Sequence, residues 1–128
     1  MRAIFDTSVF IAHERGRQLA VDRFPDEAAI SVVTLAELDL GVHLARTDDE
    51  RAARLRTLRA SEETYVALPV DRAVAAEFAA LVAAARREGR RPQVQDAWIA
   101  ATARAHRAPV VTQDSDFDGL PGVEVVRV

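Results

Sequence analysis

The sequence of 128 residues contains no cysteine and no lysine, so all 17 of its basic residues are arginines. Without cysteine, the chain can form neither a disulfide framework nor a thiolate metal site. Without lysine, it cannot be a nucleotide switch that uses a Gly-Lys-Ser/Thr phosphate loop. A receiver domain with a phosphate-sensing lysine is excluded for the same reason. The glycine fingerprint of a Rossmann dinucleotide site is also missing.

Long hydrophobic runs are absent as well. No stretch approaches the roughly 20 apolar residues that a membrane helix needs, and the apolar part of residues 1–6 is too short for a secretion signal. We therefore expect a cytoplasmic protein that has no membrane partner. The net charge of −3 is unlike that of a sequence-independent nucleic-acid coat. It is compatible with a nuclease, because bound cations cancel the charge of a cluster of acids.

The apolar content of 49% is enough for one hydrophobic core, and we expect residues 1–128 to form a single domain. Strands alternate with helices along the chain, which predicts an α/β fold with a central parallel sheet of about five strands flanked by α-helices. The expected strands are residues 2–6, 28–33, 65–70, 109–112 and 123–127. The expected helical segments are residues 9–13, 18–24, 34–46, 48–60, 72–88 and 94–107. The expected helix caps are Thr7 or Ser8, Thr34 and Asp71.

Two of the expected strands are followed by an acid. Asp6 directly follows the first strand, and Asp114 follows the fourth. In open α/β sheets, ligands bind beyond the carboxyl ends of the strands, so these two carboxylates can meet in one cleft. The competing interpretation of Asp6 is that it only caps the helix that follows it.

Two further acids lie on helices that carry apolar faces. Glu37 shares its face with Leu40, and a buried carboxylate needs a cation or a hydrogen-bonding partner. Its competing role is to complete a capping box with Thr34. Asp96 lies in a first helical turn, where the helix dipole favours an acid. It also shares a face with Ile99, which should pack on the sheet.

An acid-rich turn follows the fourth strand at residues 112–119. Asp114 is the main candidate ligand there, Asp116 is an additional one, and Asp118 is interpreted as a turn residue. Thr112 can donate a hydrogen bond to a neighbouring carboxylate. Clustered carboxylates repel one another, so they hold either raised pKa values or cations. Ligands that are all oxygen atoms suit Mg²⁺ or Mn²⁺.

Four segments, residues 4–11, 31–41, 96–103 and 111–117, together resemble the PIN domain, in particular the VapC toxin branch of bacterial toxin–antitoxin pairs. The resemblance implies a Mg²⁺- or Mn²⁺-dependent endoribonuclease that hydrolyses structured RNA such as tRNA or rRNA. It also implies a homodimer and a cognate antitoxin partner. Carried over by motif, the catalytic and metal-binding quartet is Asp6, Glu37, Asp96 and Asp114. Asp116 is a fifth candidate ligand, and Ser8 and Thr112 are expected to support the acids by hydrogen bonds.

Arginines are the expected contacts to RNA, because a guanidinium binds phosphate in a bidentate manner. The candidates are Arg86, Arg87, Arg90, Arg91 and, after the first helix, Arg15, with Arg17 nearby. The competing interpretation of the 86–91 cluster is a solvated helix end. We expect the three histidines to be surface residues. Trp98 is expected either in the core or at an interface.

Two other functions remain open from the sequence. One alternative is an RNA- or protein-binding module that keeps the fold without catalysis. The other is a DNA-directed or structure-specific nuclease that uses the same acidic cleft. All four quartet positions are acidic, which favours the nuclease over the binding module.

Overall fold

The computed structural model describes residues 2–128 and has one five-stranded sheet, in which every pair of neighbouring strands is parallel. The strand order is β3-β2-β1-β4-β5. The strands are β1 (Arg2–Phe5), β2 (Glu27–Ser31), β3 (Ala67–Leu68), β4 (Val110–Thr112) and β5 (Val125–Arg127). The helices are α1 (Thr7–Glu14), the 3-10 helix η1 (Val21–Arg23), α2 (Val32–His43), α3 (Asp48–Thr64), α4 (Arg72–Arg87) and α5 (Val94–Ala105). The predicted parallel α/β sheet is confirmed.

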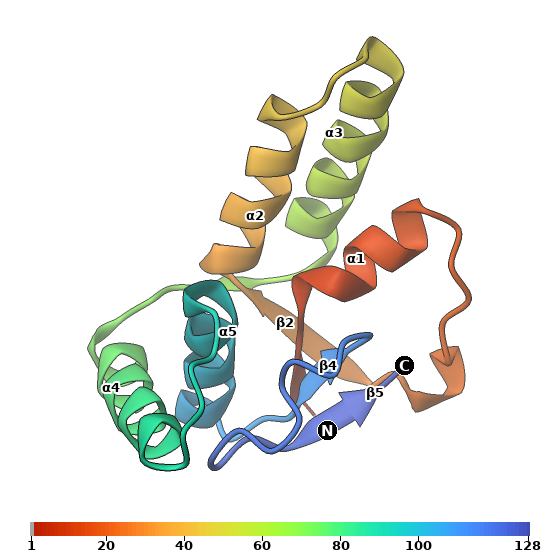
Figure 1. The fold of residues 1–128 in the computed structure, drawn as a ribbon. Coiled ribbons are helices and arrows are strands. Elements are labelled where there is room, and N and C mark those ends of the chain that lie inside the picture. The colour runs from red at the N-terminus through yellow and green to blue at the C-terminus, as the bar shows by residue number, and fades with distance from the viewer. Residues whose placement is uncertain (1) are drawn as a thin grey trace.

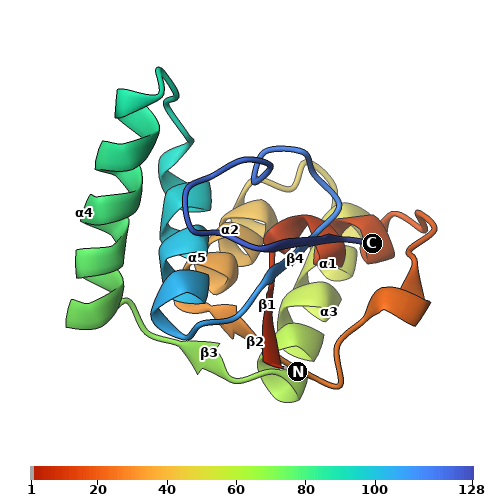
Figure 2. The same ribbon diagram turned by 90° about the horizontal axis from the view of Figure 1, so that it is seen from below.

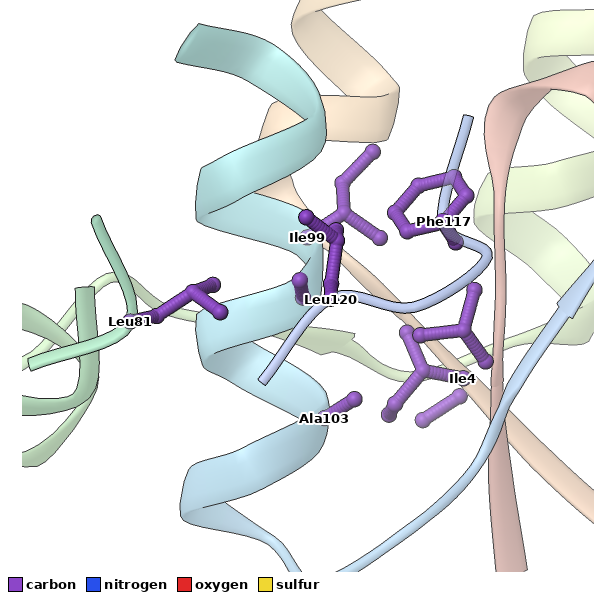
Figure 3. Close-up of a cluster of buried hydrophobic side chains, with 9 residues drawn as sticks. Ile4, Leu81, Ile99, Ala103, Phe117 and Leu120 are labelled. Atoms are coloured by element: carbon purple, nitrogen blue, oxygen red, sulfur yellow. The ribbon is translucent and has the colours of Figure 1, made fainter. Parts of the chain in front are cut away.

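The sheet has a hydrophobic cluster on each face because successive residues of a strand point to opposite sides. Ile4 of β1 and Val110 of β4 join one cluster, which also includes Ile99 of α5 and Phe117 of the loop after β4 (Figure 3). Phe5 and the other alternate positions join the second cluster, which lies against α1. On the first face, α5 lies between α4 and the sheet (Figure 2).

From β1 the chain continues to β2 and β3 on one side of the sheet and then returns to β4 and β5 on the other side of β1. This is the switch point at which open α/β sheets usually bind ligands. The carboxyl ends of β1 and β4 meet there, and the first turns of α1, α2 and α5 begin around them (Figure 1). The fold therefore brings the residues that follow β1 and β4 together.

Helices α2 and α3 pack against each other and extend beyond the sheet (Figure 1). Leu40 of α2 and Leu44, the C-cap residue that follows it, are 55% and 65% exposed, although the sequence predicted that the face they share with Glu37 turns inward. Only the start of α2 reaches the core, where Thr34 and Leu38 are buried. The predicted inward face is therefore wrong beyond the first turns of this helix.

Two predicted helix starts are wrong, each for the same physical reason. Asp6 caps α1 by accepting from the backbone N–H of Ser8, so neither Thr7 nor Ser8 is the cap. Ser31 caps α2 by accepting from the backbone N–H of Val33, which ends β2 earlier than predicted. In each case the last polar residue of the strand end satisfies the first free N–H groups of the helix.

Other predicted boundaries also moved. The helix predicted for residues 48–60 continues to Thr64, and the strand predicted for residues 65–70 is reduced to Ala67–Leu68. The predicted cap of α4 is confirmed, because Asp71 accepts a 3.0 Å hydrogen bond from the backbone N–H of Val74. Within residues 2–128, no helix is long and apolar enough to cross a membrane.

Phe117 offers a test of how the core holds the acid-rich loop. Its side chain is fully buried between two exposed acids of the loop, so Phe117→Ala leaves a cavity under Asp116 and Asp118. We expect a loss of about 3–5 kcal/mol in the free energy of unfolding, measured by urea denaturation. The exposed Val21→Ala is the control and should change stability by less than about 0.5 kcal/mol. Equal stability of the two variants would contradict this role of Phe117.

Candidate active site

Asp6 lies at the turn between β1 and α1 and is 3% exposed. Its backbone N–H donates to the carbonyl of Val111, which extends the pairing of β1 with β4. Its Oδ2 accepts a 3.0 Å hydrogen bond from the hydroxyl of Thr112 and a longer one from the backbone N–H of Ser8. The two interpretations of Asp6 are therefore compatible, because one carboxylate both caps α1 and faces the neighbouring strand end.

A chain of hydroxyl groups joins the ends of β1 and β4. The single hydrogen of the Thr112 hydroxyl goes to Asp6, so Ser8 is the donor in the 3.1 Å contact between the two hydroxyls. Ser8 in turn accepts from the backbone N–H of Gln113, and Thr112 accepts from that of Asp114. All of these bonds point towards Asp6, and aligned hydrogen bonds polarise one another. Thr112 thus contacts an acid directly, whereas Ser8 acts through Thr112.

Glu37 is half-buried near the start of α2, and its Oε1 accepts a 2.7 Å hydrogen bond from the hydroxyl of Thr7. The predicted capping box with Thr34 is wrong, because Ser31 is the cap. Burial raises the pKa of Glu37; the bond from Thr7 opposes this rise, and the charge of Asp6 adds to it. The sequence pattern did not identify this role of Thr7, because Thr7 and Glu37 lie 30 residues apart in sequence on two different helices.

Asp96 is half-buried in the first turn of α5, as predicted from the sequence. Burial, together with the negative charges of the other candidate acids, raises its pKa to about 7. Those acids are Asp6, Asp116, Glu37 and Asp114. Asp114 is exposed, but the limited desolvation of its carboxyl group also raises its pKa, with further contributions from Asp6 and Asp116. The structure therefore brings all five predicted acids within electrostatic reach of one another.

The donor set is suited to a hard divalent cation. It consists of carboxylate oxygens, with no thiolate in the chain. The pKa of Asp96 is raised first by burial and then by the charges of the other acids, and a bound cation would favour the ionised form against both effects. Across residues 2–128, no group of three or more acidic or histidine side chains is already arranged to hold a metal ion. The side chains thus share one region without meeting at one point.

The predicted arginines occupy different environments. Arg90 is partly buried beside the acid-rich loop, and a β-carbon added to Gly119 would lie 3.0 Å from its Nη1. Arg15 lines a pocket of about 180 Å³ together with Glu37. The exposed remainder of the basic cluster is Arg86, Arg87 and Arg91.

Two other arginines act on Asp114. The charges of Arg127 and Arg17 oppose the rise in its pKa. Arg127 ends β5, where it pairs with Thr112 of β4, so the strand-end rule that placed the acids could have identified it. Its Nη1 also forms a 3.2 Å ion pair with Asp118.

The histidines were predicted to be surface residues, and Trp98 was expected either in the core or at an interface. His13 and His43 are exposed, as expected, whereas His106 is half-buried. Trp98 stacks on Phe78 with ring centroids 3.8 Å apart, so it packs between α5 and α4. This contact favours the packing interpretation of Trp98 over an exposed aromatic residue.

Comparison with known proteins gives a consistent result. The sequence pattern of the PIN domain matches residues 3–123. Ribonuclease VapC5 of Mycobacterium tuberculosis is 48% identical over 128 residues, which cover 98% of this chain and 94% of that protein. Ribonuclease VapC4 of the same species is 43% identical, with 99% and 97% covered.

Structure comparison agrees with the sequence match. The crystal structure of VapBC-5 from Mycobacterium tuberculosis, a member of the VapBC family of toxin–antitoxin systems, contains a chain that matches with a TM-score of 0.90. The two chains are 45% identical, and the match covers 99% of this chain and 98% of the other. The chain belongs to the PIN-domain family, and within it to the VapC branch.

The raised pKa of Asp96 predicts how the stability of the metal-free protein varies with pH. Between about pH 4 and pH 7 the unfolded chain has lost this proton while the folded chain keeps it, so stability falls as the pH rises. We expect Asp96→Asn to raise the melting temperature by about 3–6 °C at pH 8, after allowing for solvent screening of a half-exposed group. The difference should shrink towards zero near pH 4 in thermal scans with chelator. A difference in melting temperature between Asp96→Asn and the wild type that does not vary with pH would contradict the raised pKa of Asp96.

Proposed function

We propose that residues 1–128 form a single-domain, Mg²⁺- or Mn²⁺-dependent endoribonuclease, the toxin of a type II toxin–antitoxin pair. The observation that carries the proposal is the half-buried position of Asp96 beside four other acids at the switch point of the sheet, where burial and then their charges raise its pKa. Such repulsion is costly unless a cation is bound. The similarity to proteins named ribonucleases supports RNA as the substrate.

Each acid comes from a different part of the fold. Asp6 and Asp114 follow neighbouring strands, while Glu37 comes from the second turn of α2 and Asp96 from the first turn of α5. These four side chains, with Asp116, would hold the cation. When bound, a divalent cation neutralises charge on a phosphate and lowers the pKa of water. Hydrolysis then adds water across the P–O ester bond, and the leaving oxygen takes a proton.

The RNA backbone needs positive charge near these acids. Arg15 beside Glu37, and Arg17 and Arg127 beside Asp114, flank the acids on the side of α1 and β5. Arg90 contacts the outer part of the acid-rich loop. We assign the phosphate contacts to these arginines, with Arg86, Arg87 and Arg91 further along the path of the RNA.

The proposal includes the partners of the protein. We propose structured RNA such as tRNA or rRNA as the substrate, a cognate antitoxin as the inhibitor, and a homodimer as the assembly in the cytoplasm. The antitoxin is supported by the similarity to the VapBC-5 structure, which is described as a toxin–antitoxin system.

Cleavage of total bacterial RNA tests the proposed reaction. With Mn²⁺ or Mg²⁺ we expect discrete fragments, which EDTA abolishes and which Asp6→Asn and Asp96→Asn reduce by at least about 100-fold. Glu63→Gln is the control, because this acid lies on the exposed surface of α3 and is not a predicted ligand. Denaturing gels of the RNA give the result.

Other outcomes would identify the alternatives. Equal cleavage of DNA would replace the ribonuclease with a DNA-directed or structure-specific nuclease. Uncut RNA, together with no Mn²⁺ binding by the folded protein, would favour a binding module.

The proposed phosphate contact of Arg127 can be tested by the salt dependence of RNA binding. Arg127→Gln should raise the KM for RNA by about 10-fold with a smaller change in kcat, because it removes a phosphate contact. It should also lower the slope of log KM against log salt by about one charge. Arg59→Gln, on the exposed surface of α3, is the control. Identical salt slopes for the two variants would rule Arg127 out as a phosphate contact.

A further inference from the structure

Thr7 contacts the candidate catalytic acid Glu37 directly, and the sequence pattern did not predict this contact. It is the first residue of α1, follows Asp6 in the chain and is buried. Its hydroxyl lies 2.7 Å from Oε1 of Glu37 and 3.1 Å from the hydroxyl oxygen of Thr34, and both partners belong to α2. A single side chain thus connects the turn that carries Asp6 with the helix that carries Glu37.

The Thr7 hydroxyl has one hydrogen and two acceptors within reach. An ionised carboxylate can only accept hydrogen bonds, and a bond to a charged acceptor is stronger than one to a hydroxyl. The shorter distance to Glu37 agrees with this order. Thr7 therefore donates to Glu37, and Thr34 offers an alternative acceptor when Glu37 is absent.

Burial of the Thr7 hydroxyl does not by itself require a bond to another helix, as two other buried hydroxyls show. Thr102 of α5 donates to the backbone carbonyl of Trp98 in its own helix, and Ser61 of α3 donates to that of Leu58. Such local bonds satisfy a buried hydroxyl without any long-range partner. Thr7 occupies the start of a helix but directs its hydrogen to a carboxylate of another helix.

We propose that Thr7 is a positioning residue for the cation site. Its hydroxyl fixes one carboxylate oxygen of Glu37 relative to Asp6, so that both acids are held for the same ion. The proposal rests on the proposed function of this site as a cation-binding centre. Residues that orient ligands in this way typically contribute 10- to 100-fold to metal affinity.

Mn²⁺ binding by the folded protein tests the proposal without any RNA. Thr7→Val removes the hydroxyl at nearly constant volume, and we expect the Kd for Mn²⁺, measured by calorimetry, to rise about 10-fold. Thr7→Ser keeps the hydroxyl and should restore the Kd to within about 2-fold of the wild type. In a Glu37→Ala background, Thr7→Val should cause no further change, because no carboxylate remains to be positioned.

A structural control separates positioning from folding. Thr102→Val removes a buried hydroxyl that bonds only within its own helix, so it should lower stability while leaving the Kd for Mn²⁺ unchanged. Thermal scans of each variant confirm that the titrated protein is folded. If Thr7→Val is too unstable to titrate, Thr7→Ser and Thr7→Ala give the same comparison of a side chain with the hydroxyl and one without it.

Three results would overturn the proposal: unchanged Mn²⁺ affinity in Thr7→Val, equally weak binding in Thr7→Ser, or a full effect of Thr7→Val in the Glu37→Ala background. A wild-type protein that binds Mn²⁺ but cuts no RNA would overturn the proposed ribonuclease alone. A folded wild-type protein that binds no Mn²⁺ would overturn both.

Discussion

The repulsion among five carboxylates at one edge of the sheet is the constraint on which the site depends. The effect is largest on Asp96, whose pKa is raised by burial and, in addition, by the charges of four other acids. The parallel sheet cannot avoid this arrangement, because β1 and β4 are neighbours and each is followed by an acid. The fold therefore needs positive partial charge and hydrogen-bond donors at the same edge.

Two hydroxyl systems supply the donors. Thr112 and Ser8 tie Asp6 to the end of β4, and Thr7 ties Glu37 to the end of β1. The starts of α1, α2 and α5 lie around the acids and add the positive ends of three helix dipoles (Figure 1). These groups hold the carboxylates in place without neutralising them, which leaves net negative charge for a cation.

The sequence could predict what depends on local pattern. The apolar runs before Asp6 and Asp114 predicted the strand ends, and parallel pairing then placed both acids at one edge. The start of α2 could not be predicted in this way, because Val32 and Val33 are β-branched and continue the pattern of the strand. The contact between Thr7 and Glu37 depends on how α1 meets α2, and no residue spacing encodes that. Arg127 could have been found, since it ends a strand as the acids do.

The positions of the arginines follow from the same electrostatic argument. A basic residue among the acids would form an ion pair and remove the charge that a cation needs. Arg17 and Arg127 instead lower the pKa of Asp114, which is exposed. They are not among the groups that shift the pKa of Glu37 or Asp96. Arg127 is also paired with Asp118 outside the acid cluster. Positive charge thus lies where a phosphate backbone would approach, and the half-buried acids form no ion pair that would compete with a cation.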